Sequence, residues 1–233
     1  MKAAGAASPR RQLYGRSKGK ALRPAQSQRL AEILPRVQID LERLASGPAV
    51  LFPAAPKRCV LEIGFGGGEH LAAMAKSEPE SAFLGVEPFL NGVAKLLAEV
   101  EANGLGNLRL LRGDGREVLA RLPDASLDAV YLLYPDPWPK RRQRKRRIVD
   151  PAFVAELARV IRPGGEFRFA SDIDDYVGWT LARVLPNPAF EWLARAADDW
   201  RQPWAGWHRT RYEAKAIREG RVPSYLRFLK RGA

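Results

Sequence analysis

The chain contains few of the residues on which metal sites, disulfides and hydrolase triads depend. It has one cysteine and two histidines among 233 residues, too few for a zinc site or an internal disulfide. Neither Ser171 nor Ser224 has a histidine at a spacing that suits a hydrolase triad. The chain also lacks the run of about eighteen apolar residues that spans a membrane and the apolar core of a signal peptide. These absences predict a cytoplasmic protein without a metal, in which Cys59 fills the core.

Acidic residues are also missing from two stretches in which basic residues are concentrated. Residues 1–30 contain eight basic residues and no acidic one, and residues 140–147 contain seven more basic residues. The formal net charge is +13, but the rest of the chain has 24 basic and 26 acidic residues and is nearly neutral. Positive charge confined to two segments is typical of a protein with a contact surface for a polyanion, although a charge run is often only a solvated face.

A glycine-rich turn lies within residues 60–71, VLEIGFGGGEHL. The apolar residues before the turn predict a buried strand, and those after it predict a helix. Gly64 and Gly66 permit a tight turn with the backbone close to a ligand. The dinucleotide pattern G-x-G-x-x-G is incomplete because Glu69 replaces its third glycine. The carboxylates of Glu62 and Glu69 flank the loop and repel phosphate, which argues against a nicotinamide cofactor.

Further acidic residues follow the next two predicted strands. Glu87 ends the strand at 82–86, where a carboxylate can accept hydrogen bonds from both ribose hydroxyls, and Asp114 follows the strand at 108–112. Each of these residues taken alone is also compatible with an ordinary polar strand end. Together with the glycine loop, and without a phosphate-binding lysine, the series looks like the S-adenosylmethionine site of class I methyltransferases.

Strand and helix patterns alternate along most of the chain. Strands are predicted at residues 59–63, 82–86, 108–112, 127–134, 166–170, 190–194 and 225–230. Helices are predicted at residues 69–77, 90–103, 116–122, 151–161, 174–185 and 210–219. This alternation predicts an α/β fold with a parallel sheet and helices on both faces. Residues 162–166 should form a helix-to-strand turn in which two glycines supply left-handed positions.

The sequence predicts three parts along the chain. Residues 1–24 have little periodicity and should form a basic flexible arm, either a solvated tail or a segment that orders on nucleic acid. Residues 25–56 should form a short helical lead-in, interrupted by Pro35, and a linker with three prolines. Residues 57–233 should form the α/β domain.

A proline-rich loop and a basic run follow the fourth predicted strand of the domain. Three prolines between residues 135 and 139 should hold Asp136 in an extended conformation beside the cofactor. Trp138 either offers a flat ring to a nucleic-acid base, worth about 1–3 kcal/mol if stacked, or fills the core. The basic residues at 140–147 follow directly and would hold a phosphate backbone while one base enters the pocket.

Four motifs occur in the order found in tRNA (guanine-N7-)-methyltransferases, which the chain resembles over roughly residues 50–230. They are EIGFGGG at 62–68, PDPW with the basic run at 135–147, ASD at 170–172 and TRYE at 210–213. Ser171 and Tyr212 stand where threonine and phenylalanine are common in the family. The specific motifs do not cover residues 1–45.

The resemblance implies a Rossmann-like class I methyltransferase fold with a mostly parallel seven-stranded sheet. It implies methyl transfer from S-adenosylmethionine, which becomes S-adenosylhomocysteine, to N7 of a guanine in the variable loop of tRNA, at position 46. It implies tRNA as the partner, without a membrane or an obligatory protein partner. The implied cofactor residues are Glu62, Gly64, Gly66, Glu87, Asp114 and Asp136, of which Asp136 is also catalytic. The implied substrate residues are Lys140, Asp172, Thr210, Arg211, Tyr212 and Glu213, and the implied RNA contacts are Arg142, Arg144, Lys145, Arg146 and Arg147.

Guanine N7 needs no general base, because it carries a lone pair and no hydrogen. The enzyme then mainly aligns the reacting atoms, and Asp136 offsets the positive charge that passes to the base. A carboxylate from Asp172 or Glu213 should accept hydrogen bonds from guanine N1–H and its amine, which adenine cannot offer in the same pattern. Two alternatives stay open: a methyltransferase acting on another RNA, a protein or a small molecule, and a non-catalytic RNA-binding protein of the same fold.

Overall fold

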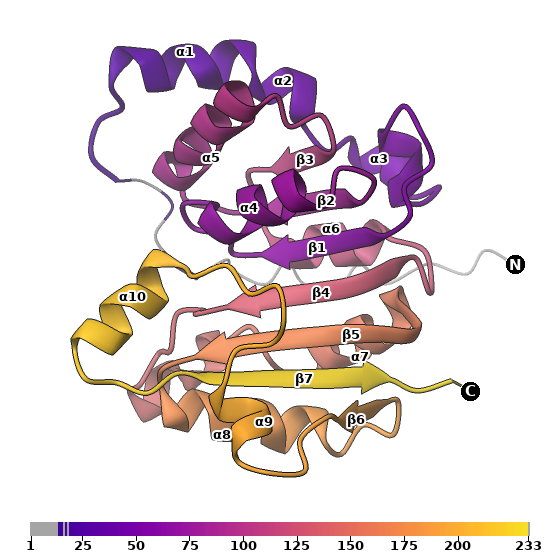
Figure 1. Cartoon of the computed structure of the whole chain (residues 1–233), viewed down its shortest axis with the longest axis vertical. Helices are drawn as coiled ribbons and strands as arrows, with labels where there is room; N and C mark the ends of the chain where they lie inside the picture. Colours follow the sequence, from indigo (N-terminus) through magenta and orange to yellow (C-terminus); the bar gives the residue numbers. More distant parts are fainter. Residues whose placement is uncertain (1–13, 16, 18, 233) are drawn as a thin grey trace, which may run out of the picture.

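The computed structural model describes residues 14, 15, 17 and 19–232, and its centre is a seven-stranded sheet (Figure 1). The strands are β1 (Cys59–Ile63), β2 (Ala82–Val86), β3 (Leu108–Leu111), β4 (Leu127–Leu133), β5 (Ile161–Ser171), β6 (Phe190–Trp192) and β7 (Ser224–Lys230). Their order in the sheet is β3-β2-β1-β4-β5-β7-β6. Strands β1 to β5 pair in parallel, and β7 runs antiparallel to β5 and β6. The prediction of a mostly parallel seven-stranded sheet is confirmed.

Helices cover both faces of the sheet. In chain order after the lead-in they are α4 (Glu69–Ser77), α5 (Leu90–Asn103), α6 (Gly115–Arg121), the 3-10 helix η2 (Arg141–Arg146), α7 (Pro151–Val160), α8 (Asp174–Val184), α9 (Asp198–Arg201) and α10 (Arg211–Arg218). Figure 1 shows α4 and α5 in front of the sheet and α6 and α7 behind it. Because strand side chains alternate between faces, Leu61 and Ile63 pack in the core on the α6 to α8 side, whereas Val60 packs in the core beneath α4 and α5.

The helical lead-in consists of short pieces that pack on the outside of the domain. They are α1 (Pro24–Glu32), α2 (Leu34–Val37), α3 (Leu41–Leu44) and the 3-10 helix η1 (Pro48–Leu51). The predicted interruption is present, and Pro35 lies in the first turn of α2, where a proline is tolerated. Asp40 begins α3 by accepting hydrogen bonds from the backbone N–H groups of Glu42 and Arg43, at 3.0 and 3.1 Å.

Much of the N-terminal segment falls outside the described residues, namely residues 1–13, 16 and 18. The predicted flexible arm at residues 1–24 is therefore described only in its second half. That half lies against the start of α5, where the Leu90 amide donates to the Ser17 carbonyl at 3.1 Å and Asn91 Nδ2 donates to the Lys20 carbonyl at 2.9 Å. No helix within the described ranges has the length and apolarity required to cross a membrane.

The turn between α7 and β5 differs from the sequence prediction. Strand β5 begins at Ile161, directly after α7, so residues 162–165 belong to the strand. Only Gly164 has a positive φ, of 79°, and the prediction of a left-handed Gly165 is wrong. Gly165 is required for a different reason, because a Cβ there would lie 2.6 Å from the Asp128 carbonyl oxygen. This close approach coincides with the shift in β4–β5 register between Leu127 and Ala129.

Candidate functional site

A cavity of about 320 Å3 opens at the carboxyl ends of β1, β2, β3 and β4. This edge is where ligands bind in open α/β sheets, because loops from neighbouring strands converge there. Five of the six predicted cofactor residues line the cavity: Gly64, Gly66, Glu87, Asp114 and Asp136. The structure thus brings together residues that are 72 positions apart in the chain.

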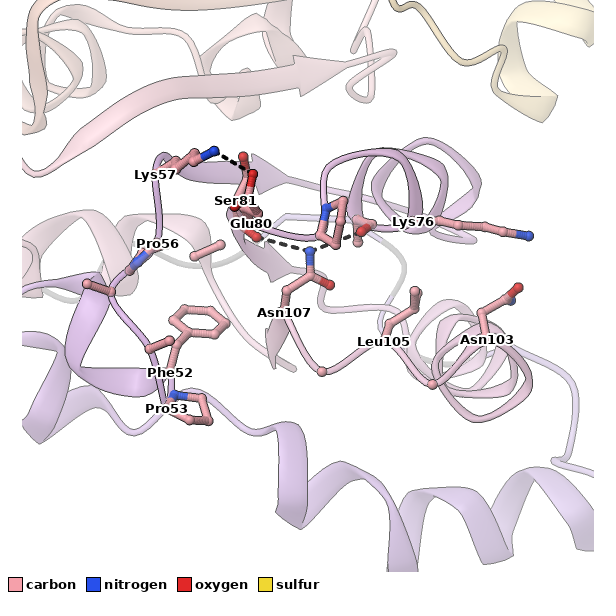
Figure 2. A pocket seen from close by; sticks show the side chains of 17 residues that line it. Phe52, Pro53, Pro56, Lys57, Lys76, Glu80, Ser81, Asn103, Leu105 and Asn107 are labelled. Atoms are coloured by element: carbon pink, nitrogen blue, oxygen red, sulfur yellow. Dashed lines mark hydrogen bonds and ion pairs between the residues drawn. The ribbon is translucent and has the colours of Figure 1, made fainter.

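A larger hollow, of about 680 Å3, lies at the opposite edge of the sheet (Figure 2). Several of its polar side chains already bind one another or the backbone. Lys57 forms an ion pair with Glu80 at 2.5 Å, and Asn107 Nδ2 donates to the carbonyl oxygens of Ala75 and Ser81, each at 3.0 Å. Because the smaller cavity contains the convergent carboxylates, we assign the candidate site to it despite its smaller size.

The glycine loop forms one wall of the candidate site. Gly64, Gly66 and Gly68 have φ values of 74°, 57° and 77°, a region that other residues rarely adopt. The Gly66 amide donates to Glu87 Oε2 at 2.7 Å and fixes the loop to the end of β2. No sequence signal points to Gly92, in the first turn of α5, where a Cβ would lie 2.1 Å from the Gly66 carbonyl oxygen. Gly92 therefore allows α5 to pack directly against the loop.

The carboxylates of the cavity sit in different surroundings. Glu87 is buried, and its second oxygen accepts a hydrogen bond from the Phe89 amide at 2.8 Å. Burial raises the pKa of Glu87 above its ordinary value, an effect that the nearby Asp136 charge reinforces and the two amide hydrogen bonds oppose. Asp136 lies at the cavity mouth, where surrounding protein atoms displace water and raise its pKa. Asp114 begins α6 by accepting a hydrogen bond from the Arg116 amide at 2.9 Å.

Glu62 is the predicted cofactor residue that does not line the cavity. It is 2% exposed, and its carboxylate bonds to His70 Nδ1 at 2.8 Å. The cause is the pleat of β1, which directs Glu62 to the face covered by α4, the helix that carries His70. In this structure the Glu62 carboxylate ties β1 to α4 behind the glycine loop, so its predicted cofactor role stays a prediction.

The proline-rich loop after β4 bends more than the sequence predicts. Tyr134 and Trp138 have φ values of 49° and 42°, and among the described non-glycine residues only Ala125 shares this region. Such strained backbone is concentrated at functional sites. The two bends bracket Asp136, so the loop is not extended throughout, and both aromatic side chains line the cavity. Trp138 therefore lies at the site, and the alternative of a core-filling ring is wrong.

The TRYE motif divides into two structural and two cavity-facing residues. Thr210 begins α10 by accepting a hydrogen bond from the Glu213 amide at 3.1 Å. Glu213 is 1% exposed, accepts a hydrogen bond from Trp207 Nε1 at 2.8 Å and also accepts one from the Tyr225 hydroxyl. Both side chains thus have structural contacts in this structure, and their predicted contact with substrate stays a prediction. The spacing Thr-x-x-Glu is itself a helix-start signal, and it could have indicated the structural role of these two residues.

The other two residues of the motif face the glycine loop. A Cβ at Gly66 would lie 3.0 Å from the Tyr212 ring, and Tyr212 lines the cavity. Arg211 Nε lies 3.6 Å from Glu69 Oε1. These distances place both side chains against the glycine loop.

The basic run forms η2 beside the cavity, and most of its side chains reach solvent. Lys140, Arg142 and Lys145 are exposed, while Arg144 is half-buried and pairs with Asp175 at 2.7 Å. Arg146 lines the cavity. Lys140 lies at the start of η2 and not among the residues that line the cavity.

Arg147 departs from the rest of the run, because its side chain turns into the protein. It is 1% exposed, pairs with Asp175 and donates to the Pro137 carbonyl at 2.8 Å. Its guanidinium lies 4.8 Å from the ring centres of both Tyr176 and Trp179 in α8. Arg147 is buried in this structure, so its predicted contact with RNA stays a prediction, and no pattern in the basic run distinguishes it from its neighbours.

Tyr134 and Asp172 follow the carboxyl ends of the paired strands β4 and β5. Asp172 is partly exposed and forms an ion pair with Arg221 at 2.5 Å. Burial, together with the neighbouring Tyr225 and Glu213, raises the pKa of Tyr134, so its hydroxyl stays protonated near neutral pH. Tyr134 is not predictable as a site residue from the sequence, because one aromatic residue at a strand end has no distinctive pattern.

Comparison with known proteins identifies close relatives. Residues 56–224 match the Methyltransf_4 family, described as "Putative methyltransferase". The chain is 55% identical to a tRNA (guanine-N(7)-)-methyltransferase from Azorhizobium caulinodans over 217 residues, covering 93% of this chain and 94% of that protein. It is 53% identical to the enzyme of the same name from Nitrobacter winogradskyi, covering 92% of this chain and 84% of that protein.

A solved structure supports the fold assignment. The crystal structure of the 16S rRNA methyltransferase KamB has a TM-score of 0.54 to this chain at 19% identity, covering 82% of this chain and 92% of that one. The predicted Rossmann-like class I methyltransferase fold is confirmed. Within the described part of the chain, no group of three or more His, Cys, Asp or Glu residues is arranged to hold a metal ion.

Proposed function

The chain belongs to the tRNA (guanine-N(7)-)-methyltransferase family, and we propose that it transfers a methyl group from S-adenosylmethionine to N7 of a guanine in tRNA. We further propose that the guanine is in the variable loop, at position 46, and that the reaction takes place in the cytoplasm. The observation that carries the proposal is an acid-lined cavity at the sheet edge with a basic segment beside it.

The cavity residues fit the proposed cofactor. S-adenosylmethionine supplies a methyl group on a positively charged sulfur. The acidic lining of the cavity suits that charge, and the glycine loop lets the backbone approach a nucleoside closely. Each oxygen of Glu87 has a second lone pair, so the carboxylate can accept hydrogen bonds from two ribose hydroxyls while keeping both backbone amides. Asp114 and Asp136 supply the other carboxylates.

Cofactor affinity should depend on pH, because the pKa values of Glu87 and Asp136 both lie above their ordinary values. Acidification protonates them at a higher pH than ordinary carboxyl groups, so affinity for S-adenosylmethionine should begin to fall at a pH above the ordinary carboxyl pKa of about 4. The free protein responds with the opposite sign, since a raised carboxyl pKa contributes stability at low pH that is lost as pH rises. Calorimetric titration at several pH values measures the effect, with S-adenosylhomocysteine, which lacks the sulfonium charge, as the control ligand. Equal pH dependence for both ligands would contradict the electrostatic explanation.

The acceptor atom determines what the protein has to do. Guanine N7 attacks with its own lone pair, so no residue needs to remove a proton. Asp136 lies at the cavity mouth, where its negative charge can stabilise positive charge that moves from sulfur to the base. The rigid loop between Tyr134 and Trp138 holds this carboxylate in place before the base arrives.

Asp172 is the candidate for reading the guanine edge, because its side chain is partly exposed, whereas Glu213 is 1% exposed and bonds to Trp207 and Tyr225. Its carboxylate can accept hydrogen bonds from guanine N1–H and the exocyclic amine. We expect Asp172→Asn to lower the single-turnover preference for guanine over adenine at the acceptor position by about tenfold or more. The measurement compares two tRNA transcripts that differ only at that nucleotide. Full retention of guanine preference would contradict the assignment.

The proposed function is tested by incubating the protein with unmodified tRNA and methyl-labelled S-adenosylmethionine. The label should appear in tRNA, and mapping should place it on one guanine of the variable loop. Labelling of a protein or a small molecule instead would support a different methyltransferase. Salt-dependent tRNA binding without transfer would support a non-catalytic RNA-binding protein.

A further inference from the structure

An arginine and two aromatic rings meet at the mouth of the cavity. The guanidinium carbon of Arg146 lies 4.9 Å from the ring centre of Trp138 and 5.1 Å from that of Tyr14, and all three residues line the cavity. Among residues 14, 15, 17 and 19–232, the Arg146 side chain has these ring contacts but no hydrogen bond or ion pair. Arg144 and Arg147, in contrast, are both held by Asp175. The Arg146 guanidinium is therefore held in place by the two aromatic rings, and a flat ligand could take its position against these rings.

Tyr14 reaches this place because the N-terminal segment runs over the cavity mouth. Gly15 also lines the cavity, has a φ of 129°, and a Cβ on it would lie 3.3 Å from Asp136 Oδ2. A few residues further on, the Ser17 carbonyl accepts a hydrogen bond from the first residue of α5, Leu90. The segment thus passes close to the proposed catalytic carboxylate and is tied to the domain beyond it.

The size of the cavity limits where a target base can bind. Its volume of about 320 Å3 is at the lower end of the range for one ligand, about 300–1,000 Å3. A nucleoside cofactor of the proposed kind would occupy most of this space. A purine that enters as well must use the mouth, where Arg146 lies against Trp138 and Tyr14.

We propose that Tyr14 and Trp138 form the binding site of the target guanine, and that Arg146 occupies this site until RNA binds. When the base enters, Arg146 moves out and its guanidinium pairs with the phosphate backbone, beside Lys145 and Arg142. This inference rests on the proposed function, and it assigns part of the substrate site to a residue of the N-terminal segment.

The charge change during methyl transfer favours aromatic rings at this position. The N7 lone pair forms the new N7–CH3 bond, and the electron pair of the broken S–CH3 bond stays on sulfur. The base therefore becomes a cation, and a ring face attracts a cation, as those of Tyr14 and Trp138 attract the Arg146 guanidinium. An arginine that stayed in place would repel the methylated base, which is why the proposal requires Arg146 to leave.

The test measures binding of the nucleoside 7-methylguanosine to the protein saturated with S-adenosylhomocysteine. Because this probe has no phosphate, it reports on the base site alone. We expect Arg146→Met to raise nucleoside affinity several-fold and to lower tRNA affinity, and Tyr14→Leu to lower nucleoside affinity by about tenfold. Tyr14→Phe should restore most of the affinity lost in Tyr14→Leu. Lys76→Gln, which removes an exposed charge at the opposite sheet edge, is the matched control for Arg146→Met.

Opposite signs for the nucleoside and for tRNA in Arg146→Met would support the proposal, because loss of a simple phosphate contact leaves nucleoside affinity unchanged. Reduced or unchanged nucleoside affinity in Arg146→Met, or unchanged affinity in Tyr14→Leu, would overturn it. Binding of S-adenosylhomocysteine verifies that each variant is folded. Since the readout needs no turnover, it is independent of the tRNA methylation assay, whose failure in the unaltered protein would count against the proposed function alone.

Discussion

Replacing Asp136 with asparagine should lower the rate of methyl transfer by about 100-fold or more while the protein remains folded. The substitution keeps the shape of the side chain and removes its charge at the cavity mouth. That charge faces positive charge at each stage, first on the sulfonium and then on the methylated base. Because Asp136 makes no contact on which the core depends, thermal unfolding should change little.

Single-turnover methylation of tRNA by Asp136→Asn and Asp124→Asn measures this effect. Asp124 is the control because its side chain is 80% exposed and does not line the cavity. The expected result is a large loss in the first variant and none in the second. A methyl-transfer rate for Asp136→Asn within about threefold of that of the unaltered protein would contradict a catalytic role for Asp136.

Arg147→Ala should lower the free energy of unfolding by about 2–3 kcal/mol, whereas Arg142→Ala should leave it unchanged. Arg147 is buried against Tyr176 and Trp179 and bonds to the Pro137 carbonyl, so its removal loosens the catalytic loop and α8 together. Asp175 remains 43% exposed, so the loss of their ion pair contributes less than the loss of packing. Arg142 is exposed and should act on RNA only.

Two measurements distinguish the structural role of Arg147 from the RNA-binding role of Arg142. They are urea unfolding and tRNA binding at several salt concentrations. Arg142→Ala should weaken tRNA binding and reduce the slope of log affinity against log salt by about one. Arg147→Lys is a useful companion, because it keeps the charge but cannot reproduce the guanidinium contacts with Pro137 and Asp175. Equal stability in all three variants would contradict the structural role of Arg147.

The sequence predicted the fold well because its strongest signals are local. Apolar runs and helical periodicity predicted β1, β2, α4 and α5 with the bounds that the structure gives. The glycine loop and the acidic strand ends predicted the position of the cavity, because parallel strands bring their carboxyl ends to one edge. Residue types and the parallel strand topology are therefore sufficient to predict these elements and the position of the cavity.

The contacts of three predicted site residues did not follow from the sequence, because these contacts depend on side-chain direction. Glu62 and Glu213 are acidic residues near the site, yet each is buried against polar partners of its own, His70 for one and Trp207 and Tyr225 for the other. Arg147 belongs to a uniform basic run but turns inward to α8. Motif membership does not reveal these directions, since they are set by packing between distant segments.

Two further residues matter only because segments that are distant in the chain come close together in the fold. Gly92 matters because α5 packs against the glycine loop, and Tyr14 matters because the N-terminal segment reaches the cavity mouth. Neither has a periodic or motif signal in its own neighbourhood. The N-terminal segment, whose sequence predicts a basic flexible arm, thus supplies the aromatic ring of Tyr14 to the proposed base site.

Methyl transfer to tRNA containing 7-deazaguanosine at the acceptor position tests the central claim most directly. This analogue keeps the guanine edge and the flat ring but has a carbon in place of N7. The account predicts labelling of the unaltered tRNA from methyl-labelled S-adenosylmethionine and no labelling of the 7-deazaguanosine tRNA, with similar affinity for both. Equal labelling of the two tRNAs would contradict it.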